Sequence, residues 1–200
     1  MKTAILKFLT IAALAASAAS PAAPGAAVKT PAPLPSDSFY QLRLPLTDQD
    51  GRTADWRQHR GKPQLVSMFY TSCQYICPLI VDSGKAIERQ LTPVQQKRIG
   101  IVLISMDPAR DNPAALRSVV DKRKLDTHRG TLPVPPVAAV GAAAGVLGVR
   151  YRQLADGEFN HTSALVLLDA DGRVLARTEQ MGRRPDPEFV EAVRRAASAP

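Results

Sequence analysis

The sequence predicts an α/β domain in which helices flank a central sheet. Two continuous apolar runs, residues 65–70 and 99–106, have the length and composition of strands that are covered on both faces. A stretch compatible with a helix follows each run, and residues 164–177 form a clear hairpin. Alternating buried strands and helices are typical of layered α/β domains.

The elements of the first half are defined by apolar spacing and by the residues that end them. Weak alternation over residues 39–44 indicates a half-exposed strand, and the Asp-Gly turn at 50–51 completes an N-terminal hairpin. After the first apolar run, a helix begins at Tyr75 or Pro78. It ends before Pro93, because proline is tolerated in a first helical turn but not in a helix interior.

The second half begins with a polar loop after residue 106. Asp107 and Asp111 are expected as turn and cap residues, with a role in organising a nearby site as the alternative. Asp111 or Asn112 would cap a helix that ends near Leu125. The remaining expected elements are an irregular stretch at 131–136, a helix at 137–147, a short strand at 149–152, the hairpin with its turn at 169–172, and a helix at 187–197.

The N-terminal region has the pattern of an exported protein. Residues 1–20 combine Lys2 and Lys7 with a short apolar stretch and small-residue cleavage sites, as a signal peptide does. That stretch is shorter than the ~20 residues of a membrane-spanning helix. Residues 21–36 are rich in Ala and Pro and are predicted to be a linker, and residues 37–200 suit one domain. We expect a periplasmic protein, with an uncleaved segment that anchors it to the inner membrane as the open alternative.

The charge of the chain argues against nucleic-acid binding. There are 26 Lys and Arg against 18 Asp and Glu, for a formal net charge of +8. The arginines are scattered, whereas nucleic-acid binders gather such charge on one helix face or with aromatics. A solvated basic surface that favours acidic proteins or membrane surfaces is therefore expected, on a membrane-proximal monomer.

The two cysteines are the most informative feature. Cys73 and Cys77 directly follow the first buried strand and precede a helix that starts with proline. A spacing of four would place both sulfurs on one face of a helical turn, where helix-start N–H groups favour thiolates. Two adjacent thiolates form a soft site for Cu(I) or Zn(II), or a pair that cycles as a disulfide. A purely structural disulfide is less favoured, because so short a loop suppresses little chain entropy.

A third ligand would have to come from one of three histidines. His161 stands in the short loop before the hairpin strand, which can fold over the cysteine turn in a sheet of this order. Two thiolates and one imidazole suit Cu(I), whereas structural zinc is normally four-coordinate and no fourth ligand is obvious. From position alone, a surface role for His161 stays open. His59 and His128 lie in polar surroundings and are not expected to bind metal.

In combination, these motifs resemble the SCO/SenC family of copper-binding, thioredoxin-like proteins over residues 38–190. The resemblance implies a thioredoxin-like fold with an added N-terminal hairpin and copper bound by Cys73, Cys77 and His161. It also implies a role in building the binuclear copper centre of cytochrome c oxidase, as copper donor, thiol reductant or both. The partner would be the copper-accepting oxidase subunit or another periplasmic copper carrier. The motifs that carry it are residues 69–73 with 77–78, residues 105–108 with 110–111 and 113, and His161 before 165–169 and 172.

The chain departs from the family pattern at a few positions. The family often has Pro-Asp where this chain has Gln74 and Tyr75, and Asp where it has Asn160. A tryptophan is common near the position of Gly130. None of these differences removes a ligand, but the loss of two acids beside the site leaves the client open.

The main alternative is a periplasmic thiol-disulfide oxidoreductase, with Cys73 and Cys77 as its redox-active pair. Such enzymes usually have two residues between the cysteines, and this chain has three. They also place a cis-proline in the facing loop, whereas residues 160–163 contain no proline. A passive exported domain with a stapling disulfide would leave His161 unexplained.

Overall fold

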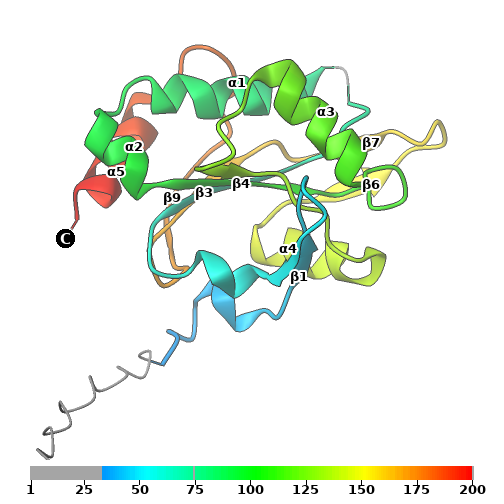
Figure 1. Ribbon diagram of the computed structural model, residues 1–200, viewed down its shortest axis with the longest axis horizontal. Coiled ribbons are helices and arrows are strands. Elements are labelled where there is room, and N and C mark those ends of the chain that lie inside the picture. Colours follow the sequence, from blue (N-terminus) through cyan, green and yellow to red (C-terminus); the bar gives the residue numbers. More distant parts are fainter. Residues whose placement is uncertain (1–32, 74, 200) are drawn as a thin grey trace, which may run out of the picture. The chain divides into compact units, whose positions relative to one another are not determined.

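A computed structural model describes residues 33–73 and 75–199 (Figure 1). The expected signal peptide and residues 21–32 of the expected linker lie outside the described residues. Within the described part of the chain, no helix is long and apolar enough to cross a membrane.

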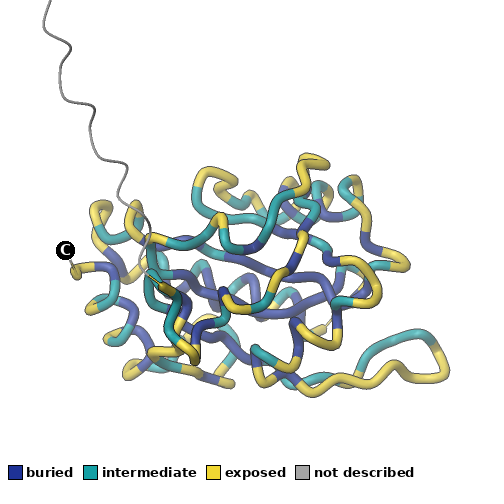
Figure 2. Tube along the Cα trace, turned by 90° about the horizontal axis from the view of Figure 1, so that it is seen from below, coloured by how far each residue is buried: buried dark blue, intermediate teal, exposed yellow. Residues whose placement is uncertain are grey.

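A five-stranded sheet forms the centre of the domain. β3 is its middle strand; it runs parallel to β4 and antiparallel to β8. Every residue of β3 and of β8 is buried, as their continuous apolar runs predict. The segments that run through the middle of the domain are mostly buried, and the loops at its edges are mostly exposed (Figure 2). In spatial order the strands are β5 (Gly130–Thr131), β4 (Gly100–Ser105), β3 (Gln64–Phe69), β8 (Leu165–Leu168) and β9 (Val174–Thr178).

Helices and the N-terminal hairpin cover the two faces of this sheet. Figure 1 shows α1, α3 and α5 on one side, and α4 with the hairpin strand β1 on the other. Leu65 and Leu167 pack with Phe189 of α5, whereas Val66 and Leu168 belong to the cluster that contains Trp56. The helices are α1 (Ile76–Glu88), α2 (Pro93–Arg98), α3 (Pro113–Arg123), α4 (Val140–Val146), α5 (Pro187–Ser198), and the 3-10 turns η1 (Phe39–Gln41), η2 (Trp56–His59) and η3 (Val137–Ala139).

The N-terminal hairpin is present, but its first strand is not where the sequence predicts it. The expected strand over 39–44 is wrong, because η1 occupies Phe39–Gln41. The Ser38 hydroxyl accepts a hydrogen bond from Tyr40 N at 3.0 Å, and this local cap favours the turn over an extended chain. The hairpin instead pairs β1 (Pro45–Thr47) with β2 (Thr53–Asp55).

A second hairpin lies beside the sheet; its first strand overlaps the strand predicted at 149–152, whereas its second strand is not predicted. β6 (Tyr151–Gln153) pairs antiparallel with β7 (Phe159–His161), and Tyr151 is opposite His161. These two strands form a separate two-stranded sheet. His161 is therefore the last residue of a strand, and the loop expected around it begins only at Thr162.

Candidate metal centre

The cysteine turn lies at the carboxyl end of the central strand, as the sequence predicts. Cys77 is in the first turn of α1, and Cys73 precedes that helix. The backbone N–H of Cys77 donates to Cys73 Sγ, and the N–H of Tyr70 donates to Cys77 Sγ, each at 3.4 Å. Both cysteines are buried free thiols. Backbone donors at the end of a strand thus bring the two sulfurs together.

The two thiols differ in acidity. Burial raises the pKa of Cys73, but hydrogen bonds from Cys77 and from the Tyr75 backbone outweigh this effect, and the pKa lies below its ordinary value. Burial raises the pKa of Cys77 well above its ordinary value, and the negative charge of Asp111 adds to the effect. Cys73 is therefore the first to form a thiolate.

The two ring nitrogens of His161 have different surroundings. Its Nδ1 lies 3.2 Å from the carbonyl oxygen of Thr162, so Nδ1 carries the proton and Nε2 the lone pair. Nε2 is buried and has no hydrogen-bond partner among the described residues. Burial lowers the pKa of His161, with only a partial opposing effect of the Thr162 contact, which keeps the ring neutral. A neutral imidazole is the form that binds metal ions.

The structure brings the thiols together but leaves His161 one side chain away. Its ring meets the Tyr70 ring edge-on, with 5.9 Å between centroids. Tyr70 and the two cysteines line one cavity, and His161 lines a different one with Arg150 and Arg152. Among the described residues, no three His, Cys, Asp or Glu side chains are grouped closely enough to hold a metal. Tyr70 therefore separates the predicted imidazole ligand from the predicted thiolates.

The other two histidines have different surroundings. His59 belongs to η2, where its ring packs edge-on against Trp56, and burial lowers its pKa to about 4. It is a packed neutral side chain, in contrast to the polar surroundings that the sequence indicates. His128 is exposed in the turn before β5, and its backbone N–H donates to Asp126.

Asp111 does not cap a helix. Asn112 caps α3, by accepting from Ala115 N at 3.0 Å. The buried carboxylate of Asp111 instead accepts from the backbone N–H and the hydroxyl of Thr71, and from the Ser105 hydroxyl at 2.6 Å. It thus ties the start of the cysteine turn to the end of β4, which is the organising role that the sequence left as an alternative.

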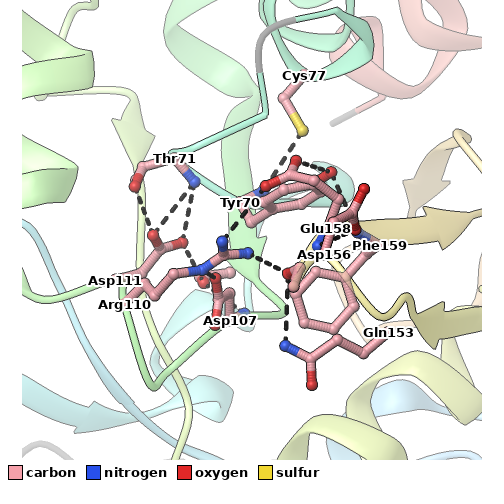
Figure 3. A network of polar contacts seen from close by, with 12 residues as sticks. Tyr70, Thr71, Cys77, Asp107, Arg110, Asp111, Gln153, Asp156, Glu158 and Phe159 are labelled. Atoms are coloured by element: carbon pink, nitrogen blue, oxygen red, sulfur yellow. Dashed lines mark hydrogen bonds and ion pairs between the residues drawn. The ribbon is translucent and has the colours of Figure 1, made fainter.

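Tyr70 and Arg110 are site residues that sequence reasoning does not identify. The Tyr70 hydroxyl donates to Glu158 at 3.0 Å and accepts from Phe159 N at 3.4 Å. Arg110 pairs with Asp107 and Glu158, and its guanidinium lies 5.8 Å from the centre of the Tyr70 ring (Figure 3). Two features of the sequence could have indicated these residues: Tyr70 stands just before the cysteine turn, and Arg110 lies in a charged run.

Of the positions that depart from the family pattern, Gln74 lies outside the described residues, and Gly130 pairs with Ile101 near the start of β4, away from the cysteine turn. The Tyr75 side chain is 86% exposed, and Asn160 is exposed in β7. Gly130 begins the edge strand β5. Tyr75, between the two cysteines in the chain, and Asn160, next to His161, thus change the exposed surface at these places and not the predicted ligands.

Comparisons with known proteins identify the family. The SCO1/SenC family model matches residues 36–198. The structure of Bradyrhizobium japonicum ScoI with copper bound has a TM-score of 0.63 at 24% identity, over 78% of this chain and 98% of that one. BsSco, described with a disulfide switch and as a member of the Sco family of cytochrome c oxidase assembly proteins, has a TM-score of 0.66 at 18% identity, over 80% of this chain and 94% of that one.

A sequence relative gives a consistent result. A Stutzerimonas stutzeri protein named for copper binding is 24% identical over 131 residues, which are 65% of this chain and 64% of that protein. The match thus spans slightly less than two thirds of the relative. The structural likeness confirms the expected thioredoxin-like arrangement of a sheet with flanking helices. Because the family model covers most of the described domain, the chain belongs to the SCO1/SenC family.

Proposed function

We propose that this protein binds copper through Cys73, Cys77 and His161. The observation that carries the proposal is the buried Nε2 of His161, which has no partner among the described residues and belongs to a ring that meets the Tyr70 ring edge-on, one side chain away from the thiols. An unsatisfied buried polar atom costs about 1–3 kcal/mol, which a ligand at its lone pair would offset. Two soft thiolates and one neutral imidazole suit Cu(I), with room for a further ligand on Cu(II).

Binding by all three residues requires the imidazole to approach the thiols, because Tyr70 stands between them in this structure. Copper is cargo in this proposal. Cu(I) tolerates changes in ligand number, so it can pass to a partner by ligand exchange without release of a free ion. We propose that the protein is exported and that its copper serves the binuclear copper centre of cytochrome c oxidase, in line with the resemblance of its motifs and the description of BsSco.

The test is titration of the reduced protein with Cu(I) and with Cu(II). Cys73→Ala and Cys77→Ala should each abolish tight binding of Cu(I). His161→Ala should weaken Cu(II) binding and change its absorption spectrum, whereas the exposed His128→Ala should match the wild type. If His161→Ala keeps the wild-type Cu(II) affinity and spectrum, the three-ligand site is wrong.

A second function, reduction of client disulfides, is favoured by the unequal pKa values of the two thiols. The Cys73 thiolate would attack a client disulfide and displace one client thiolate. Cys77, after losing its proton, would then attack the mixed disulfide, release the second client thiolate and leave a Cys73–Cys77 disulfide. Insulin reduction with an external thiol reductant separates the two functions. Rapid turnover by a protein that takes up no copper would favour the reductase.

A further inference from the structure

The hairpin that carries His161 is weakly attached to the rest of the domain by its backbone. β6 and β7 pair only with each other in the described structure, and the five-stranded sheet has no ladder to either strand. All three residues of β6 are exposed. Side-chain contacts must therefore contribute much of what holds His161 near the cysteine turn.

Two side chains, Arg110 and Tyr70, supply most of the polar and ring contacts that the described residues make with the hairpin, and Arg110 bonds the tip. Its Nη2 donates to the carbonyl oxygen of Gly157 at 2.7 Å, and its Nη1 pairs with Glu158 at 3.3 Å, both at the tip of the hairpin. Its Nε pairs with Asp107, in its own loop. Figure 3 shows the guanidinium between the loop after β4 and the hairpin, near Tyr70 and Phe159. Its carbon lies 6.0 Å from the Phe159 ring centre, within cation–π range.

Asp111, the next residue along the chain, contacts the cysteine turn. Asp111 holds the backbone N–H of Thr71 at 3.1–3.2 Å and also accepts from its hydroxyl. Adjacent residues of one loop therefore contact the cysteine turn and the histidine hairpin. The Tyr70 hydroxyl closes the ring of contacts through Glu158 and Phe159 N.

We propose that Arg110 is a positioning residue that sets the place of His161 relative to Cys73 and Cys77. Its role toward copper rests on the proposed function, whereas its role in holding the hairpin does not. A planar guanidinium can bond a carbonyl and a carboxylate together while it covers an aromatic ring, which a lysine cannot do. Removal of a group that orients a metal ligand typically lowers metal affinity by about 10- to 100-fold.

The first test uses metal-free, reduced protein. Hydrogen exchange is measured for wild type, Arg110→Ala, Arg110→Lys and Arg173→Ala, the last of which removes an exposed arginine that pairs with Asp37. Arg110→Ala should speed exchange at Leu154, whose N–H donates to Glu158 across the hairpin, and at Phe159, whose N–H donates to the Tyr70 hydroxyl, by about tenfold or more, and leave β3 unchanged. The exchange rates of Arg110→Lys should lie between those of wild type and Arg110→Ala, and those of Arg173→Ala should match wild type. Equal hairpin exchange in wild type and Arg110→Ala would overturn the proposal.

The second test measures copper binding by the same variants beside His161→Ala. Arg110→Ala should lower Cu(II) affinity by about 10- to 100-fold and move its spectrum toward that of His161→Ala. Cu(I) affinity should change less, since two thiolates can hold that ion. Unchanged Cu(II) binding in Arg110→Ala, with an effect of His161→Ala, would overturn the role toward copper. Failure of wild type to bind copper would refute the proposed function, and hydrogen exchange would still decide whether Arg110 holds the hairpin.

A variant that does not fold does not end the test. Glu158→Gln keeps a side chain of the same size, removes the charge that pairs with Arg110, and leaves one acceptor oxygen where Arg110 and Tyr70 now contact one each. It should raise hairpin exchange in the same residues by a smaller factor. Exchange unchanged in both Glu158→Gln and Arg110→Lys would also overturn the proposal.

Discussion

Acidification is expected to destabilise the domain through His59, whose ring is held neutral by its surroundings. The ring packs edge-on against Trp56 with 6.3 Å between centroids, and its Nε2 is buried without a hydrogen-bond partner in the described structure. Burial, with a smaller effect of the positive charge of Lys62, lowers the pKa of His59 from 6.5 to about 4. The folded protein therefore resists protonation of this ring.

The direction and size of the effect follow from that difference. Since the unfolded chain binds the proton first, the stabilisation is complete above the unfolded pKa of 6.5 and is lost as the pH falls towards about 4. One pKa unit corresponds to about 1.4 kcal/mol. The difference of about 2.5 units (6.5 minus about 4) then amounts to a loss of about 3 kcal/mol in unfolding free energy between neutral pH and about pH 4.

Urea unfolding of wild type and His59→Gln, at neutral pH and near pH 4, measures this contribution. The quantity of interest is the change with pH, because the substitution also alters packing at every pH. His161, Glu88 and Asp111 have shifted pKa values as well, but they are present in both proteins and their contributions cancel. The variant should lose about 3 kcal/mol less than wild type on acidification. Parallel losses in the two proteins would refute the neutral, buried state of His59.

Three further predictions concern the site and the core. Brief iodoacetamide treatment of reduced protein near neutral pH should modify Cys73 well before Cys77, because the pKa of Cys73 is lowered and burial raises that of Cys77; peptide mapping that finds Cys77 modified first would contradict this order. Asp111→Asn should lower the pKa of Cys77, because it removes one of the negative charges that raise it, and the pH dependence of alkylation at Cys77 in wild type and variant measures the change. Gly172→Ala should cost about 2–4 kcal/mol in urea unfolding, because φ is +83° and an added Cβ would lie 2.6 Å from the Tyr40 ring; an unchanged midpoint would contradict that geometry.

Sequence patterns predict the parts of this fold whose residues are buried. β3, β4 and β8 are continuous apolar runs, so their place in the sheet could be predicted. α2 has no buried residue and hence no apolar period, although Thr92 and Gln95 form a capping box that could have marked it. β6 is exposed throughout, so the sequence predicts a short strand at 149–152 but not its pairing with β7.

The candidate site likewise has a part that the sequence predicts and a part that it does not. Cys73 and Cys77 are neighbours in the chain, so their pairing at the end of β3 follows from local structure. The distance between them and His161 depends on where a separate hairpin docks, and no local pattern encodes that. Docking here is decided by side chains from three segments, through Tyr70, Arg110 and Glu158.

The thiols and the imidazole are therefore held by elements of different stability. The thiols follow a strand whose six residues are all buried, so their positions are set by the same packing that stabilises the domain. The imidazole belongs to a short strand that pairs with a fully exposed one, although Ser67 of β3 donates to the carbonyl oxygen of Ala164 at 2.6 Å and fixes the chain just beyond it. Local opening costs least where few apolar contacts are buried, so the hairpin can move while the thiols stay in place. Under the proposed function, in which copper is taken up and then passed on, this arrangement puts the proposed imidazole ligand on the element whose local opening costs the least free energy.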